Sequence, residues 1–174
     1  HRHRAGDMQG TAEDVEQLCD WFASSGPALK RLSLASKLKR SRQNECTMSL
    51  TALLANALNG ISNRHLVEIS VIHGGASSSF NYLVGAPAQS VRFVQSLVLD
   101  GSDFSVADME LLSSVAAANR LKALTTLSLK YCKLAAEQIE PLVLAIRDGA
   151  LRDIKSLDLS VNALGDAGMQ ALVD

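Results

Sequence analysis

Side chains that could carry out catalysis or hold a metal are few and scattered in this chain of 174 residues. The histidines and cysteines are His1, His3, His65, His73, Cys19, Cys46 and Cys132. No two cysteines form a CxxC pair, so the sequence indicates neither a zinc site nor a disulfide framework. Glu137 and Glu140 have the spacing of a solvated helix face. Because nothing predicts an acid–base pair, a triad or a metal cluster, we expect a non-enzymatic protein without cofactors.

Composition and charge exclude several classes of protein. A hydrophobic share of 47% and a net charge of −1 at pH 7 are typical of a globular chain, not of a disordered or polyelectrolyte-binding one. No apolar run approaches the roughly 20 residues that a membrane span needs. Cysteines that are odd in number and far apart favour a reducing compartment. We therefore expect a cytoplasmic protein that neither enters a membrane nor binds a specific nucleic acid.

Charge is distributed unevenly along the chain. Residues 1–45 carry 8 basic and 6 acidic side chains, whereas residues 100–174 carry 7 basic and 11 acidic ones. A predicted basic loop comprises Lys37, Lys39, Arg40 and Arg42. Such a loop can engage an acidic protein surface, tubulin-like tails or phosphate groups, but no aromatic residues are interleaved in it for base stacking. The alternative, which we favour, is a solvated insertion.

An internal repeat is the strongest pattern in the chain. An apolar triplet at spacing 0, +3, +5 occurs at Leu29/Leu32/Leu34, Leu66/Ile69/Val71, Val94/Leu97/Leu99, Leu124/Leu127/Leu129 and Ile154/Leu157/Leu159. Each triplet ends in the two-residue alternation of a short strand, and helical periodicity follows it, as in 106–116 and 136–146. A strand–helix unit of about 30 residues returns the chain to the same edge of a sheet. We therefore predict parallel strands with the helices on one face.

The segments SLVLDGSDF, TLSLKYCKL and SLDLSVNAL resemble leucine-rich repeats of the long, ribonuclease-inhibitor-like type. This resemblance implies an α/β solenoid with a parallel sheet on the concave face and helices on the convex face. The Asn/Cys position of the repeat is occupied by Lys37, Gly74, Ser102, Cys132 and Asn162. In the family this side chain bonds to loop backbone inside the solenoid. Lys37 and Gly74 depart from that pattern.

Two regions are expected along the chain. Residues 1–27 are predicted to form an N-terminal helix, a half repeat or cap, because Thr11 and Asp14 form a capping signal and Gly26-Pro27 ends the apolar periodicity. Residues 28–174 are predicted to form a leucine-rich repeat domain of five repeats. The chain is hypothesised to be a segment of a longer array, because no polar cap follows the last repeat.

Residues between the inward positions of each triplet are predicted to face the concave side of the sheet. The larger ones form a candidate protein-binding patch that comprises Ile72, His73, Val98, Asp100, Lys130, Tyr131 and Asp158. Tyr131 is the only aromatic residue in this concave set, and an exposed Tyr beside apolar and charged groups is typical of a binding hot spot. The alternative is that Asp100 and Lys130 form a solvated cross-strand pair and that nothing binds there.

The resemblance implies a class of function rather than one activity. Similar proteins include GTPase-activating proteins for a nuclear-transport GTPase, actin-capping regulators, innate immune sensors and cytoskeletal or axonemal scaffolds. We predict a protein-interaction or scaffold module whose protein partner the residues do not identify. The alternatives are a structural component of a large cytoskeletal or axonemal assembly and a GTPase-activating regulator of a small GTPase.

Overall fold

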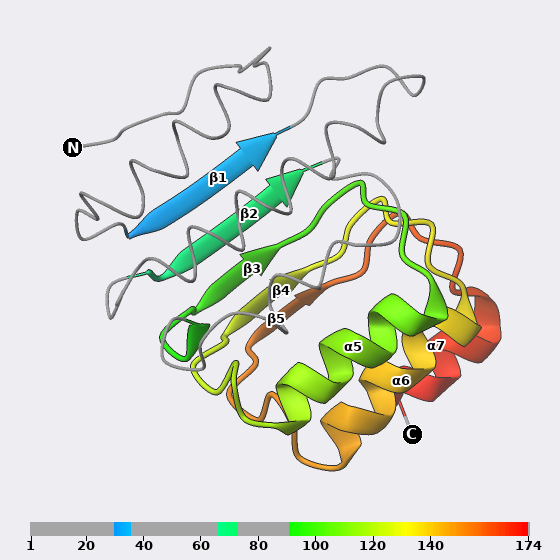
Figure 1. Cartoon of the computed structure of the whole chain (residues 1–174). Helices are drawn as coiled ribbons and strands as arrows, with labels where there is room; N and C mark the ends of the chain where they lie inside the picture. The colour runs from blue at the N-terminus through cyan, green and yellow to red at the C-terminus, as the bar shows by residue number, and fades with distance from the viewer. Residues whose placement is uncertain (1–29, 36–65, 73–90, 174) are drawn as a thin grey trace.

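Five short parallel strands form one sheet in the computed structural model, which describes residues 30–35, 66–72 and 91–173. The strands are β1 (Arg31–Ala35), β2 (Glu68–Ile72), β3 (Ser96–Val98), β4 (Thr126–Ser128) and β5 (Ser156–Asp158). Their order in the sheet is their order in the chain, as Figure 1 shows. All four pairs of neighbouring strands are parallel, so the predicted parallel arrangement is confirmed.

The register of the sheet matches the period of the sequence. The middle apolar residue of each predicted triplet pairs with its equivalent in the next strand, in the series Leu32, Ile69, Leu97, Leu127 and Leu157. The turn before each strand also repeats its hydrogen bonds. The carbonyl oxygen of Thr125 accepts from the backbone N–H groups of Lys155 and Ser156, at 2.8 and 3.0 Å. One repeat earlier, the carbonyl oxygen of Gln95 accepts in the same way from the N–H groups of Thr125 and Thr126.

Three helices of the described region follow β3, β4 and β5. They are α5 (Val106–Ala117), α6 (Ala136–Arg147) and α7 (Gly165–Val173), and Figure 1 shows them side by side in chain order. α5 begins at Ser105, whose hydroxyl accepts from the Asp108 backbone N–H at 3.2 Å while the Asp108 carboxylate accepts from the Ser105 N–H at 2.9 Å. Before α6, Ala135 has no hydroxyl, but the Gln138 side chain accepts from its N–H at 3.0 Å.

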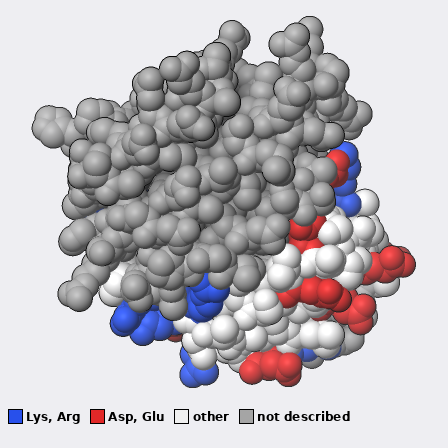
Figure 2. Space-filling view, in the orientation of Figure 1, with Lys and Arg blue, Asp and Glu red and all other residues white. Residues whose placement is uncertain are grey.

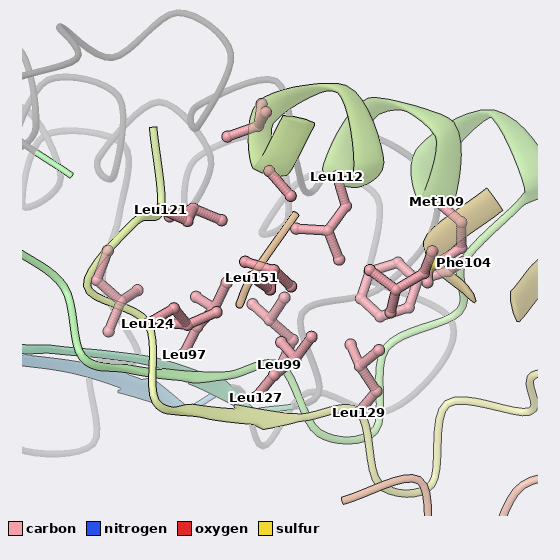
Figure 3. Packing of buried hydrophobic residues seen from close by; sticks show 14 of the residues in the cluster. Leu97, Leu99, Phe104, Met109, Leu112, Leu121, Leu124, Leu127, Leu129 and Leu151 are labelled. Carbon is pink, nitrogen blue, oxygen red and sulfur yellow. The ribbon is translucent and has the colours of Figure 1, made fainter. Parts of the chain in front are cut away.

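The core lies between the sheet and the helices. Leucines of β3 and β4, such as Leu97 and Leu127, and the α5 residues Met109 and Leu112 point toward one another in Figure 3, and these residues are fully buried. Phe104 is the one aromatic residue of the buried core in the described residues, so aliphatic side chains fill nearly all of it. Equivalent leucines therefore stack in layers, which is the packing expected of a solenoid.

Asn162 ties two neighbouring repeats together. Its Oδ1 accepts from the backbone N–H groups of Cys132 and Leu134 at 2.9 and 3.0 Å, and its Nδ2 donates to the carbonyl oxygens of Leu129 and Leu159 at 2.8 and 2.9 Å. The amide thereby uses both its acceptor and its donor capacity on backbone groups. This is the role that the resemblance implied for the side chain.

Cys132 occupies the same position one repeat earlier. Its thiol lies 3.3 Å from the carbonyl oxygen of Leu99 and 3.4 Å from that of Lys130, so it acts as a weak donor to the loop. Burial raises the pKa of the thiol to about 11, so it stays protonated at neutral pH. Ser102, at the equivalent position before it, is also buried.

Several sequence-based predictions lie outside the described residues. These are the N-terminal helix within 1–27, the basic loop at 37–42, His73 of the candidate patch, and the departures Lys37 and Gly74 from the repeat pattern.

Burial of equivalent leucines differs between β4 and β5, and we expect stability to follow it. Leu127 is 0% exposed, whereas Leu157 is partly exposed. Leu127→Ala should lower the free energy of unfolding by about 2–5 kcal/mol, because it leaves a cavity in a closed layer. Leu157→Ala should cost about half as much or less. Urea denaturation of both variants measures the difference, and equal losses would contradict layered packing.

Asn162→Ala should also destabilise the chain, by about 2–4 kcal/mol, because two partly buried N–H groups lose their acceptor. The control is Gln95→Ala, which truncates an exposed polar side chain and should change stability by no more than about 0.5 kcal/mol. If the two variants unfold at the same denaturant concentration, Asn162 does not hold the loops together.

Candidate protein-interaction surface

The face of the sheet opposite the core, the predicted concave surface, is called here the open face. Residues that alternate with the inward leucines lie on it in two rows. One row pairs Ser96, Thr126 and Ser156, and the next pairs Val98, Ser128 and Asp158. Most of these side chains are small and polar, so larger groups at the ends of the strands stand out above them.

The structure brings most of the predicted patch together. Val98 and Asp158 lie on β3 and β5, and Asp100, Lys130 and Tyr131 lie where β3 and β4 end. Ile72 ends β2, two residues beyond the Ser70–Val98 pair, so it lies at the same edge of the sheet. All six residues are partly or well exposed.

Asp100 does not form the solvated ion pair with Lys130 that was considered as an alternative. Its Oδ1 accepts hydrogen bonds from the Ser128 hydroxyl at 2.6 Å and from the Lys130 backbone N–H at 3.1 Å. The ion pairs among the described residues are Arg31–Glu68 and Lys133–Asp103. The ammonium group of Lys130 instead lies 5.2 Å from the centre of the Tyr131 ring, within the range of a cation–π contact.

Asp158 is held by its own strand end. The backbone N–H of Ser160 donates to its Oδ1 at 2.9 Å. Hydrogen bonds from the Ser160 side chain and backbone lower the pKa of this carboxyl, with a smaller contribution from the positive charge of Lys130. Asp158 is therefore ionised at neutral pH. Because it pairs with Ser128 across the sheet, Ser128 has a carboxylate on either side.

Tyr131 and Val161 protrude from equivalent positions of neighbouring repeats. They are 55% and 59% exposed, and both have a φ of +58°. Gly101 occupies the same position one repeat before Tyr131 and has a φ of +74°. This left-handed conformation suits glycine and is unfavourable for L side chains, above all for a β-branched one.

The sequence-based patch omitted Val161. It stands 30 residues after Tyr131, so the repeat alignment placed it correctly, but its side chain suggested no chemistry. The missing signal was the backbone conformation, which periodicity does not report. The candidate surface therefore has two exposed apolar side chains at the strand ends, Tyr131 and Val161, where the sequence pointed to Tyr131 alone.

The described residues show no sign of metal or membrane chemistry. Within 30–35, 66–72 and 91–173, no group of three or more His, Cys, Asp or Glu side chains is placed to hold a metal ion. In the same part of the chain, no helix has the length and apolar character needed to cross a bilayer.

The helices present both acidic and apolar side chains. In the orientation of Figure 2, acidic side chains gather over the region where α5, α6 and α7 lie. Glu110, Glu137 and Glu140 are exposed acidic residues of α5 and α6. Exposed apolar side chains on α6 and α7 are Leu144, Met169 and Val173.

Comparison with known proteins agrees with this architecture. A family model described as "Leucine Rich repeat" matches residues 150–173. The solved structure of the tropomodulin C-terminal domain from Caenorhabditis elegans is similar, with a TM-score of 0.57 and 16% sequence identity, and the match covers 92% of each chain. No curated protein matches the chain. The repeated sequence, the in-register parallel sheet and the matched family model together support a leucine-rich repeat protein, and the fold is that of a leucine-rich repeat solenoid.

Proposed function

We propose that this chain is a non-enzymatic protein-interaction module that binds a protein partner on the open face, at the strand ends around Tyr131. The observation that carries the proposal is that Tyr131 and Val161 are large, exposed side chains at left-handed positions of the backbone. Asn119, Lys133 and Leu151 also have a positive φ, so it is the exposure of large apolar side chains at such positions that points to a contact. Glycine would relieve the strain at both positions, and Gly101 shows that the repeat accepts glycine there. Large exposed side chains that lower stability are best explained by a contact that they make.

The fold supports binding because it holds the surface rigid. Tyr131 is fixed from both sides: its N–H donates to the Ser160 carbonyl at 3.2 Å, and the next residue, Cys132, donates its N–H to Asn162. A partner therefore meets a backbone that is already ordered, so little backbone entropy is lost on this side of the interface.

A reducing, cytoplasmic location belongs to the same proposal. It is supported by Cys132, a buried free thiol that contacts the Leu99 and Lys130 carbonyl groups. Oxidation of this sulfur would place a larger polar group inside the loop.

Loss of the Tyr131 and Lys130 side chains should weaken binding without unfolding the protein. We expect Tyr131→Ala/Lys130→Ala to reduce capture of the partner by about tenfold or more, because hot-spot truncation costs about 2 kcal/mol. Quantitative affinity capture from the native source with mass spectrometry measures this. Glu137→Ala/Glu140→Ala on α6 is the matched control and should leave capture unchanged. The reverse result would move the contact to the helices, as expected of a structural component in a large assembly.

Val161→Gly separates stability from binding. It should raise the free energy of unfolding by about 0.5–1 kcal/mol through relief of the left-handed strain, while it weakens capture of the same partner. Ser156→Gly, in the ordinary extended backbone of β5, should instead lower stability by about 0.5–1 kcal/mol. Thermal and urea unfolding measure both effects. A destabilised Val161→Gly variant would show that the valine serves the fold, and the argument from strain would fail.

A further inference from the structure

Two carboxylates with fixed positions flank the centre of the open face. Asp100 is held by the Ser128 hydroxyl and the Lys130 N–H, and Asp158 is held by the Ser160 N–H. Oδ1 of Asp100 accepts two hydrogen bonds, and Asp158 accepts from the Ser160 N–H and from the Ser160 side chain. A carboxylate has about four lone-pair sites, so both groups can still accept from a ligand. The two residues come from β3 and β5, which are about 10 Å apart because β4 lies between them.

The positive charge nearest to the two aspartates offsets only part of their negative charge. Lys130 lies between them in the order of the strands; its ammonium group is 5.2 Å from the centre of the Tyr131 ring and acts on Asp158 through its charge. Lys133, further along the same loop, is paired with Asp103 at 2.8 Å. Two carboxylates beside one ammonium group leave this part of the open face with an excess of negative charge, which favours a cation from a partner.

Apolar and hydroxyl groups beside the carboxylates indicate which other chemical groups the ligand should carry. Tyr131 and Val161 offer an apolar contact at the strand ends. Ser96, Thr126 and Ser156 stand in register on three adjacent strands, about 4.8 Å apart, and present a line of hydroxyl groups that can donate to and accept from peptide groups.

We infer that the open face over β3, β4 and β5 takes an extended, basic protein segment. A Lys or Arg side chain of this segment lies between Asp100 and Asp158, and an apolar side chain packs on Tyr131 and Val161. This inference rests on the proposed function and adds the chemistry of the partner. The excess of acidic over basic residues in 100–174 also attracts a basic partner at long range.

The test uses a phage-displayed library of random dodecapeptides selected on the full chain. Enriched peptides should combine Lys or Arg with a large apolar residue. A synthetic copy of the strongest one should bind Asp100→Asn and Asp158→Asn about three- to fivefold more weakly in fluorescence anisotropy, and more weakly still at higher salt. Both substitutions keep Oδ1 as an acceptor, so the internal hydrogen bonds survive. Glu140→Gln removes the same charge from α6 and should leave the affinity unchanged.

The outcomes separate this inference from the proposed function. Enriched peptides that lack basic residues would contradict the inference that the partner is basic. The same conclusion would follow if the peptides bound both Asn variants as tightly as the unmodified chain but lost affinity for Tyr131→Ala. Either outcome leaves the proposed binding surface in place. Peptides indifferent to every variant, or no enrichment at all, overturn both. Self-association of the chain that Asp158→Asn abolishes, measured by ultracentrifugation, also overturns the inference, because a second copy would then occupy the face.

Discussion

The structure depends on one constraint: each repeat must place its inward leucines level with those of its neighbours. Leu97, Leu127 and Leu157 pair directly across the sheet, and the same backbone carbonyl in each preceding turn accepts two N–H groups from the next repeat. A slip of one residue would turn every strand leucine toward the open face. The sheet therefore requires the register of the strand leucines and not one repeat length: Leu32 pairs with Ile69 over 37 residues, and Ile69 pairs with Leu97 over 28. The described helices cover the side to which the leucines point.

This constraint also explains the strain at the strand ends. The chain must leave the strand and turn toward the helices within a few residues, and the ladder position that follows, Cys132 or Asn162, must point inward to reach the backbone of its neighbour. The residue before it is forced into the left-handed region whether it is glycine, as at Gly101, or not, as at Tyr131 and Val161. Strain of about 1–2 kcal/mol at each such residue is tolerable, because cooperative contacts along the solenoid exceed it.

The sequence predicts the fold well because periodicity is a property of residue types. The five triplets mark the five strands, and the Asn-like position marks Asn162 with its four backbone hydrogen bonds. The site is harder to predict. That Asp100 bonds to Ser128 rather than pairing with Lys130 depends on side-chain geometry between repeats. The importance of Val161 depends on a φ angle that no residue pattern reports. The sequence therefore points to a candidate surface around Tyr131. The contribution of Val161 and the hydrogen bonds of Asp100 come only from the coordinates.

Small residues determine what the open face can offer to the proposed partner. Serines and threonine fill most of the two rows between β3 and β5, and Ser128 is nearly buried between its neighbours even though it faces away from the core. A flat floor of this kind offers little apolar area, so affinity must come from the few groups that rise above it. Those groups are two apolar side chains at one end and two carboxylates beside them. β4 lies between the strands that carry Asp100 and Asp158, and one repeat separates Tyr131 from Val161. The regular scaffold therefore fixes the distances between these four side chains. The packing of the repeat and the proposed binding chemistry therefore depend on the same few residues at the strand ends, where the fold fixes a left-handed backbone.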